Sequence, residues 1–330
     1  MSRARAALLA VALLPGCYLA HVARGQLSIL TGRVPIEEVI EEGDRPWVEL
    51  EKLRLVLAAR RFAIDACGLE ETGAYTTFYE TEGPYVVWNL SGSEPDAFAA
   101  YWWSFPIVGS IPYLGFFARE PALEEQRALA AEGLDTAVLP VVAYSTLGWF
   151  DDPFYSGLLR EDEAGIVSTV IHEMTHTTVY APGQADWNEN MATFVGTEGA
   201  RRFFLARGGP DDPGIAALDG HAVADAAAIA SVRAVRDQLW RVYESSGPRA
   251  EKLARKAVLL GTGGRSEPLN NAHLLMVSRY HGDQELFAEV LRACGNDLPA
   301  MVAVLKRLAE EEDPRAATVA WARGEPLPDD

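Results

Sequence analysis

Two histidines and a glutamate near the middle of the chain have the types and the spacing of a metal centre. They occur in the segment His172-Glu173-Met174-Thr175-His176. Residues four apart on a helix lie on one face about one turn apart, so both imidazoles can bind the same ion. Glu173 follows the first histidine directly, where its carboxylate can reach a water on that ion and accept a proton. The pattern therefore predicts metal-activated water with a carboxylate as general base.

The sequence around this motif predicts a helix with one buried face. At about 100° per residue, six residues form a single apolar stripe. They are Ile166, Val167, Val170, Ile171, Met174 and Thr178. His172 and His176 fall on the opposite side, where the short residues Gly165, Ser168 and Thr169 leave room for a ligand. A histidine that served only to fill the core would lie on the stripe, so the position of this pair favours metal binding.

A third ligand has to come from another part of the chain. The metzincin motif HExxHxxGxxH would supply it, but Val179 and Pro182 stand where that motif needs glycine and histidine. This class of metalloprotease is therefore excluded. Residues 182–183 are a turn signal, and a second helix is predicted after them with Glu189 in its first turn.

Asp186 or Asn188 is expected to cap this second helix. One of its faces has almost no side-chain volume beyond a carboxylate. That face carries Glu189, Ala192, Gly196 and Gly199. Small residues let two helices pack closely, and a glutamate needs this proximity to reach an ion held by the neighbouring helix. We therefore expect Glu189 to be the third ligand, with Glu198, Asp186 and a distant histidine as alternatives.

Several segments resemble those of known proteins. HExxH followed by an Asn-Glu-x-x-Ala helix resembles the gluzincin group of metallopeptidases. More closely, the chain resembles the bacterial lipoprotein family named putative aminopeptidases, in the same order over most of its length. The matching segments are YVVWN (85–89), AYSTLGWFDDP (143–153), HEMTH (172–176), NENMATFVG (188–196) and LNNAHLL (269–275). The resemblance implies an α+β, zincin-like fold: a small mixed sheet with an edge strand beside the HExxH helix, followed by a mainly helical lobe.

The resemblance also implies an activity, the hydrolysis of peptide bonds with Zn²⁺ as cofactor. His172, His176 and Glu189 would bind the zinc ion, and Glu173 would be the general base. A donor to the developing oxyanion is also needed. Tyr280, which follows the LNNAHLL segment, is the first choice for this role, with His281 and His273 as alternatives.

Release of single N-terminal residues would require one further group, an acidic side chain that binds the free amine of the peptide. Glu80, Glu82 and Asp152 are candidates, and nothing in the sequence selects one of them. Aminopeptidase activity therefore follows from the resemblance alone. The alternative from another class is a non-catalytic envelope lipoprotein that uses the fold for binding or scaffolding. An intact Glu173 argues against it, because a structural zinc site normally fills all four positions with protein ligands.

The N-terminus predicts export from the cytoplasm and a lipid anchor. Arg3 and Arg5 precede an apolar run over residues 6–14, which is too short to span a bilayer and is typical of a signal peptide. Leu14-Pro15-Gly16-Cys17 resembles a lipoprotein cleavage box. We expect removal of residues 1–16 and lipidation of Cys17, which would place the protein on a membrane of the bacterial envelope, facing the periplasm. An ordinary signal peptide is the alternative.

The composition argues against nucleic acid as a partner and is sufficient for a large hydrophobic core. The formal net charge of −18 disfavours nucleic acid, and 49% hydrophobic residues suffice for a core. We expect an N-terminal α+β lobe over residues 17–199 and a helical lobe over residues 200–330 of the same catalytic unit. His21 and His221 are interpreted as surface residues.

The cysteine content does not decide whether the protein contains a disulfide bond. Cys67 and Cys294 could pair in an oxidising compartment, but sequence alone cannot match two cysteines so far apart. Members of the resembling family carry a Cys-x5-Cys pair at the positions of Ser104 and Ser110. This chain therefore lacks the local disulfide that the resemblance would imply.

Residues 136–145 are predicted to form an edge strand, because Pro140 lies inside the run. Such a strand could pair with an extended peptide beside the metal, or it could be an ordinary edge. The loop over residues 147–153 is expected to line the cleft, and Asp151 or Asp152 could orient a ligand histidine or simply form a turn. Other strands are expected over 75–79, 85–89 and 105–117, and helices over 46–67, 121–132, 200–207, 222–243, 250–260, 272–280, 284–294 and 299–311.

Overall fold

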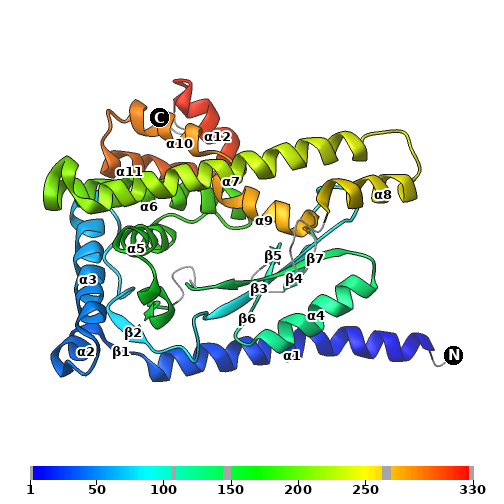
Figure 1. Ribbon diagram of the computed structural model, residues 1–330, viewed down its shortest axis with the longest axis horizontal. Coiled ribbons are helices and arrows are strands. Elements are labelled where there is room, and N and C mark those ends of the chain that lie inside the picture. The colour runs from blue at the N-terminus through cyan, green and yellow to red at the C-terminus, as the bar shows by residue number, and fades with distance from the viewer. Residues whose placement is uncertain (1–2, 106–108, 144–149, 262–268, 327–330) are drawn as a thin grey trace.

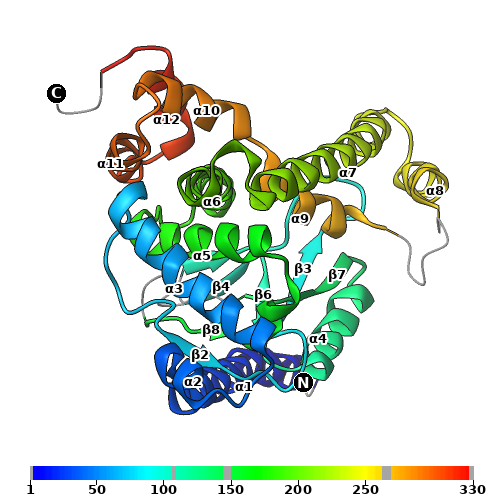
Figure 2. The ribbon, with the colours of Figure 1, turned by 60° about the vertical axis from the view of Figure 1, so that its left-hand side comes forward.

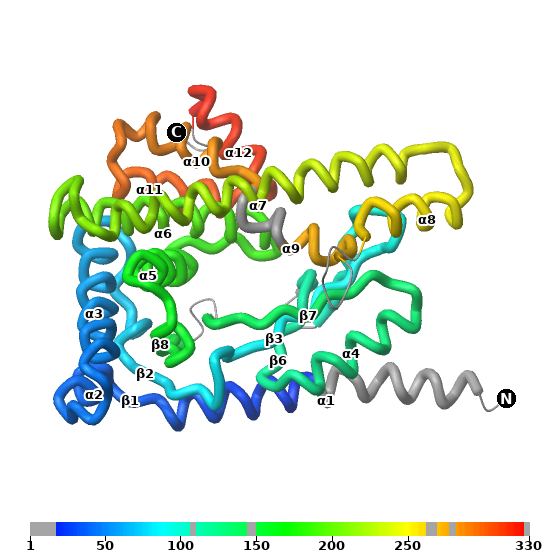
Figure 3. Tube along the Cα trace, viewed as in Figure 1, coloured from blue at the N-terminus to red at the C-terminus, as the bar shows by residue number. Residues whose placement is uncertain are grey.

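The protein is described here by a computed structural model (Figure 1). It describes residues 3–105, 109–143, 150–261 and 269–326, and the side chains of 3–17, 109 and 277–281 lie outside the described set (Figure 3). The architecture is α+β, mostly helical with small sheets. A layer of helices covers one side of the sheets, and helix α1 (Arg3–Gly32) runs along the opposite side (Figure 1).

The HExxH segment lies on α5 (Glu163–Thr178), near the centre of the molecule (Figure 2). Asp162 caps this helix, since its side chain accepts the N–H of Gly165 at 2.8 Å. The predicted apolar stripe is buried: five of its six residues have no exposed surface and Thr178 is 9% exposed. It packs in one core with α3 (Trp47–Cys67) and α6 (Ala185–Gly208). Each fully buried aliphatic side chain there stabilises the fold by about 1.5–3 kcal/mol.

Within the described residues the strands form three small sheets rather than the single mixed sheet that was expected. In one of them β3 (Val87–Ser93) lies between β6 (Leu114–Phe116) and β7 (Asp135–Val141), antiparallel to both. A mixed sheet contains β1 (Val34–Pro35), β2 (Thr77–Tyr79) and β8 (Phe154–Tyr155). The third sheet is a hairpin of β4 (Trp103–Phe105) and β5 (Gly109–Ile111). The expected strand over 105–117 is not continuous, because β5 ends at Ile111 and β6 begins at Leu114.

Strand β7 lies at the edge of its sheet, as Pro140 predicted. The carbonyl of Val141 accepts the N–H of Val86, whereas the carbonyl of Thr136 accepts the side-chain amide of Asn270. Odd-numbered residues of β7 therefore face β3, and even-numbered residues face the open edge. Pro140 is even-numbered, so its missing N–H removes no hydrogen bond from the ladder.

Helix α1 is fastened to the sheets by its second half. The hydroxyl of Tyr18 donates to the carbonyl of Gly115 at 3.2 Å, and Nε2 of His21 accepts the N–H of Phe117 at 3.0 Å. The interpretation of His21 as a surface residue is therefore wrong. Burial, followed by the nearby charge of Arg24, lowers the pKa of His21 and favours the neutral ring that this contact requires.

The remaining helices complete the two sides of the molecule. They are α2 (Ile36–Glu42), α4 (Arg119–Ala131), α7 (Pro213–Tyr243), α8 (Arg249–Leu260), α9 (Asn271–His281), α10 (Gln284–Ala293), α11 (Leu298–Leu308) and α12 (Pro314–Ala322). Short 3₁₀ turns, η1 (Ser156–Arg160) and η2 (Gly209–Asp211), precede α5 and α7. Helix α12 was not predicted. Among the helices of the described chain, α7 alone is long and apolar enough to cross a membrane, by length and composition only.

Helix α6 is continuous across residue 199, where a boundary between two lobes was expected. The predicted helix over 200–207 is its second half. One hydrophobic core includes buried residues of α3, α5, α6, α10 and α11, so the C-terminal helices share a core with the HExxH helix. A side chain at Gly68, the left-handed cap of α3, would come within 2.9 Å of the backbone of Pro299 in the first turn of α11.

The two described cysteines are both free. Cys67 is buried at the end of α3, and burial, which outweighs the nearby charge of Arg202, raises the pKa of its thiol to about 12. Cys294 is half-buried after α10. The two residues do not form the disulfide that the sequence left open.

Candidate metal centre

Two glycines on α6 let this helix approach the HExxH helix. A Cβ atom at Gly196 would lie 2.8 Å from the carbonyl oxygen of Ser168 and 3.0 Å from Cβ of His172. A Cβ atom at Gly199 would lie 3.0 Å from Cγ2 of Ile171. Contacts below 3.0 Å are essentially never seen for a real Cβ, so α5 and α6 are as close at Gly196 as backbones permit. The small-residue face of α6 therefore packs against α5.

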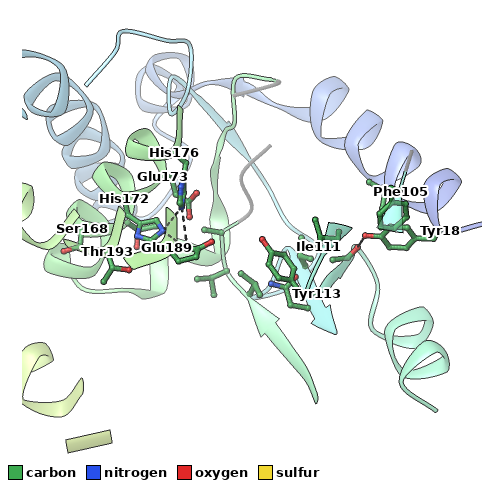
Figure 4. Close-up of a pocket in the computed structure, with 18 of the residues that line it drawn as sticks. Tyr18, Phe105, Ile111, Tyr113, Ser168, His172, Glu173, His176, Glu189 and Thr193 are labelled. Carbon is green, nitrogen blue, oxygen red and sulfur yellow. Dashed lines mark hydrogen bonds and ion pairs between the residues drawn. The ribbon is translucent and has the colours of Figure 1, made fainter. Parts of the chain in front are cut away.

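This close packing brings together the three predicted ligands His172, His176 and Glu189 (Figure 4). The Nε2 atoms of the two histidines are 3.2 Å apart. Oε2 of Glu189 lies 3.4 Å from Nε2 of His172 and 3.6 Å from Nε2 of His176. The His176 side chain is 4% exposed, and the other two are 15–16% exposed. The three ligand atoms therefore converge on one point in a nearly buried site.

The spacing of these atoms fits a tetrahedral ion. Zinc binds histidine nitrogen and carboxylate oxygen at about 2.0–2.2 Å, and the ligands of a regular tetrahedron are then about 3.3–3.6 Å apart. The three observed separations, 3.2, 3.4 and 3.6 Å, span this range. Two imidazoles and one carboxylate also form a donor set of the zinc type.

Electrostatics keep Glu189 ionised, as a metal ligand must be. Burial alone would raise the pKa of this carboxyl group. Hydrogen bonds from His172 and His176, together with their charge, outweigh burial and hold the pKa of Glu189 well below its ordinary value. The carboxylate therefore points at the histidine pair in its charged form.

Glu173 lies beside the ligand group and faces the same cleft (Figure 4). Glu173 interacts electrostatically with Tyr75, a residue that the sequence did not single out. Tyr75 is 1% exposed, has a left-handed backbone with φ 58°, and its hydroxyl has no hydrogen-bond partner. Burial first, and then the charge of Glu173, raise the pKa of Tyr75 well above its ordinary value. A neutral phenol therefore lies within electrostatic reach of the Glu173 carboxylate.

A cleft of about 510 Å³ leads away from the ligand group. At the group it is lined by hydroxyl residues of α5 and α6, including Ser168 and Thr193 (Figure 4). It continues past Val142 and Ala143, which follow β7, and ends between α1 and the β4–β5 hairpin. This volume is within the range of about 300–1,000 Å³ that is usual for small-ligand sites.

Comparison with known proteins identifies the family. The family model described as "Putative aminopeptidase" matches residues 17–262. The chain belongs to this family. No curated protein and no solved structure match the chain. The segment over 269–275, which contributed to the resemblance, lies outside the matched range.

The family-like segment after residue 269 has a structural explanation. Asn270 caps α9 and binds the carbonyl of Thr136 at 2.8 Å. Asn271 is fully buried, and its side-chain amide donates to the carbonyls of Glu94 and Ala97 at 2.9 and 3.0 Å. The two residues therefore hold α9 against the sheet, far along the chain from their partners.

Several alternatives to the predicted site residues are placed elsewhere. Glu198 pairs with Arg202 at 2.9 Å, on the same helix. Neither Asp186 nor Asn188 caps α6, because the helix begins at Ala185 and Gln184 is its cap residue. Asn188 instead binds both the N–H and the carbonyl of Ala181, which fixes the turn before α6. A cap and a turn clamp use the same residue type, so the sequence could not separate them.

The candidates for the oxyanion donor are only partly described. The backbone of Tyr280 and His281 belongs to α9, and their side chains lie outside the described residues. Nδ1 of His273 is 3.0 Å from Oδ1 of Asn270. His221 is exposed beside Asp162, as a surface residue should be.

The acidic residues that were considered for amine binding do not line the cleft. Glu80 is exposed and pairs with Arg45. Glu82 is not among the residues of the cleft wall. Asp152 is 3% exposed, and its backbone carbonyl accepts the N–H of Tyr75 at 2.8 Å. Asp151 also lies outside the wall. Of the loop over 147–153 that was expected to line the cleft, residues 147–149 fall outside the described residues, and residues 150–153 are not part of the cleft wall.

Ser104 and Ser110 stand directly opposite each other on β4 and β5. Their hydroxyl oxygens are 2.9 Å apart. A cross-strand hydrogen bond thus occupies the place where the resemblance implied a disulfide in other family members. The hairpin at the far end of the cleft is therefore held by a weaker, non-covalent link in this chain.

Proposed function

We propose that this protein is a zinc-dependent peptidase with a zincin-like, gluzincin-type site. The observation that carries the proposal is the arrangement of His172, His176 and Glu189 at the spacing of tetrahedral ligands, with Glu173 beside them in an open cleft. The family description, which names a peptidase, agrees with it.

The protein groups have distinct roles in this proposal. Zinc, when bound by the three ligands, supplies a Lewis acid that polarises a carbonyl and acidifies water to a pKa of about 7. Glu173 accepts the proton of the attacking water at a carboxylate oxygen and later delivers it to the leaving amine. The buried phenol of Tyr75 lies within electrostatic reach of Glu173.

The open edge of β7 is suited to hold a peptide. The N–H and carbonyl of Val138 and the carbonyl of Pro140 face this edge, and the strand leads to Val142 and Ala143 in the cleft wall. An extended peptide that pairs with this edge would be carried past the ligand group. The start of the edge is closed by Asn270, so pairing would be confined to the end of β7 nearest the ligands.

We also propose that Cys17 carries a lipid and anchors the protein in the bacterial envelope, facing the periplasm. The ring of Tyr18 packs on Phe105 and Phe116, at 5.6 and 5.2 Å between centroids. A lipid on the preceding residue would therefore be attached close to the body of the protein, without a long linker. Membrane fractionation of a Cys17→Ser variant tests this proposal: the variant should leave the membrane fraction, and its retention there would contradict a lipid anchor at this residue.

Glu173→Gln tests the proposed activity. The variant should retain zinc and lose about 10²–10⁴-fold in peptide hydrolysis, because only the general base is removed. Glu198→Gln is the matched control: the same change on α6, at a residue paired with Arg202, should leave both properties unchanged. Chelator-sensitive cleavage by the wild type is required. Full activity of the Glu173 variant would remove this residue from the reaction, and no cleavage by the wild type would favour a binding or scaffolding protein.

A further inference from the structure

We propose that the cleft accepts an internal stretch of a peptide chain, with a large apolar side chain on one side of the scissile bond, rather than a free N-terminus. This inference rests on the proposed peptidase activity and specifies its substrate class. It concerns the position of the cut and the chemistry that selects it.

The ligand group lies between two unlike parts of the cleft (Figure 4). On one side are the hydroxyl groups of Ser168 and Thr193. On the other side the cleft passes Tyr113 and Ile111 and reaches Tyr18 and Phe105 (Figure 4). The cleft wall therefore continues on both sides of the ligand group, and we infer that a bound chain follows it in both directions. An enzyme that removes single terminal residues would need only one of these directions.

The far part of the cleft is an apolar site with a fixed shape. The ring of Tyr18 packs against Phe105 in a tilted arrangement, and its hydroxyl donates to the carbonyl of Gly115, so this wall does not depend on a substrate for its position. Leu19 and Val22 extend the wall along α1, and Leu19 is 47% exposed. Large apolar or aromatic side chains gain most from leaving water in such a site.

The described lining offers the ammonium group of a free N-terminus no carboxylate beyond the two that the proposed reaction uses. Among the lining residues that the structure describes, Glu173 and Glu189 are the only carboxylates, and none is lysine or arginine. Glu189 already faces two histidines, and Glu173 is needed for proton transfer. Within the described lining an α-ammonium group would therefore find no carboxylate that is not already engaged, which is unfavourable, whereas an uncharged internal segment needs no such partner.

A pair of peptides tests the position of the cut. They share one sequence with a central phenylalanine, and one of them is N-acetylated. The zinc-loaded wild-type protein should cleave both at the same internal bond, with rates that differ less than about 3-fold. An enzyme that binds the free amine by a charged hydrogen bond would prefer the free peptide by about 10–150-fold. Stepwise release of N-terminal residues from the free peptide alone would overturn the inference.

Leu19→Ser tests the apolar part of the cleft, with Leu27→Ser as its matched control. Both residues lie on α1 and are exposed, at 47% and 61%, but only Leu19 lines the cleft. For the phenylalanine peptide, kcat/KM of the Leu19 variant should fall by about 3–10-fold, and the Leu27 variant should match the wild type. For a peptide with alanine in place of phenylalanine, the Leu19 variant should also match the wild type. An equal fall in kcat/KM of the Leu19 variant on both peptides, or no fall on either, would contradict an apolar binding site at Leu19.

The outcomes separate this inference from the proposed function. Chelator-sensitive release of N-terminal residues that is lost in Glu173→Gln would leave the peptidase in place and reject internal cleavage. The absence of any chelator-sensitive cleavage would reject both. Internal cleavage of the acetylated peptide, lost in Glu173→Gln, would uphold both.

Discussion

The close approach of α5 and α6 predicts that Gly196→Ala will impair metal binding. The added methyl group would lie 2.8 Å from the carbonyl oxygen of Ser168 and 3.0 Å from Cβ of His172. The first contact is with backbone, which cannot rotate away. The helices must therefore separate by several tenths of an ångström, and the separation occurs at a ligand histidine.

The expected magnitudes follow from this geometry. Overpacking of a tight interface costs about 1–3 kcal/mol, and the gain in helix propensity from glycine to alanine offsets about 1 kcal/mol. Because the contact is with a carbonyl oxygen, we expect a net loss near the upper end, about 2 kcal/mol, in the free energy of unfolding of the metal-free protein. Displacement of His172 relative to Glu189 should weaken zinc binding by about 10–100-fold, as loss of ligand support commonly does.

The assay compares three glycine variants by urea unfolding without metal and by competition for zinc with a chromophoric chelator. Gly220→Ala is the control for helix propensity: nothing lies within 4 Å of its added methyl group, so it should stabilise the protein by about 0.5–1 kcal/mol. Gly199→Ala meets the side chains of Ile171 and Cys67, at 3.0–3.2 Å, and should lower stability while zinc affinity stays within about 3-fold of the wild type. Zinc affinity of Gly196→Ala equal to that of the wild type would refute the claim that helix proximity sets the ligand geometry.

Two further predictions concern stability. Tyr75→Phe removes a fully buried hydroxyl group that has no hydrogen-bond partner, and should raise the free energy of unfolding by about 1 kcal/mol; a loss of stability in thermal unfolding would show that the hydroxyl is satisfied. Arg207 beside Asp212, aided by the N–H of Gly214 and opposed by burial, holds the pKa of that carboxyl group below its ordinary 3.8. The ionised Asp212 therefore stabilises the fold fully above pH 3.8, and this stabilisation is lost as pH falls through the lower pKa of the folded protein. The difference in the free energy of unfolding between the wild type and Asp212→Asn should accordingly shrink below about pH 3.8. A constant difference across that range would contradict this ion pair.

Local sequence patterns predicted the elements around the centre. The apolar stripe of α5 is buried as its periodicity indicated, and Gly68 ends α3 in a left-handed conformation. Glu189 points at the histidines because the small face of α6 turns toward α5. Each of these features depends on residues within about two turns of one another, or on one close helix pair.

Features that depend on distant partners could not be predicted. Lys256 is 7% exposed and binds Asp135 and the carbonyl of Pro95, and the N–H of Asn271 also binds Asp135. These contacts join segments more than a hundred residues apart, and no periodicity marks them. The role of Tyr75 was missed for the same reason, since its neighbour Glu173 lies on another element. Residues 200–207 were predicted as a separate helix, whereas they continue α6, in which Gly199 allows close helix packing.

The most direct test of the account is zinc binding by the wild type, Glu189→Ala and Glu198→Ala, measured by metal analysis after dialysis and by competition with a chelator. The wild type and the Glu198 variant should each bind one zinc per chain with equal affinity. The zinc affinity of Glu189→Ala should be lower than that of the wild type by at least about 100-fold, because removal of one ligand from this set leaves only the histidine pair. Zinc binding by Glu189→Ala at wild-type affinity would contradict the three-residue metal centre.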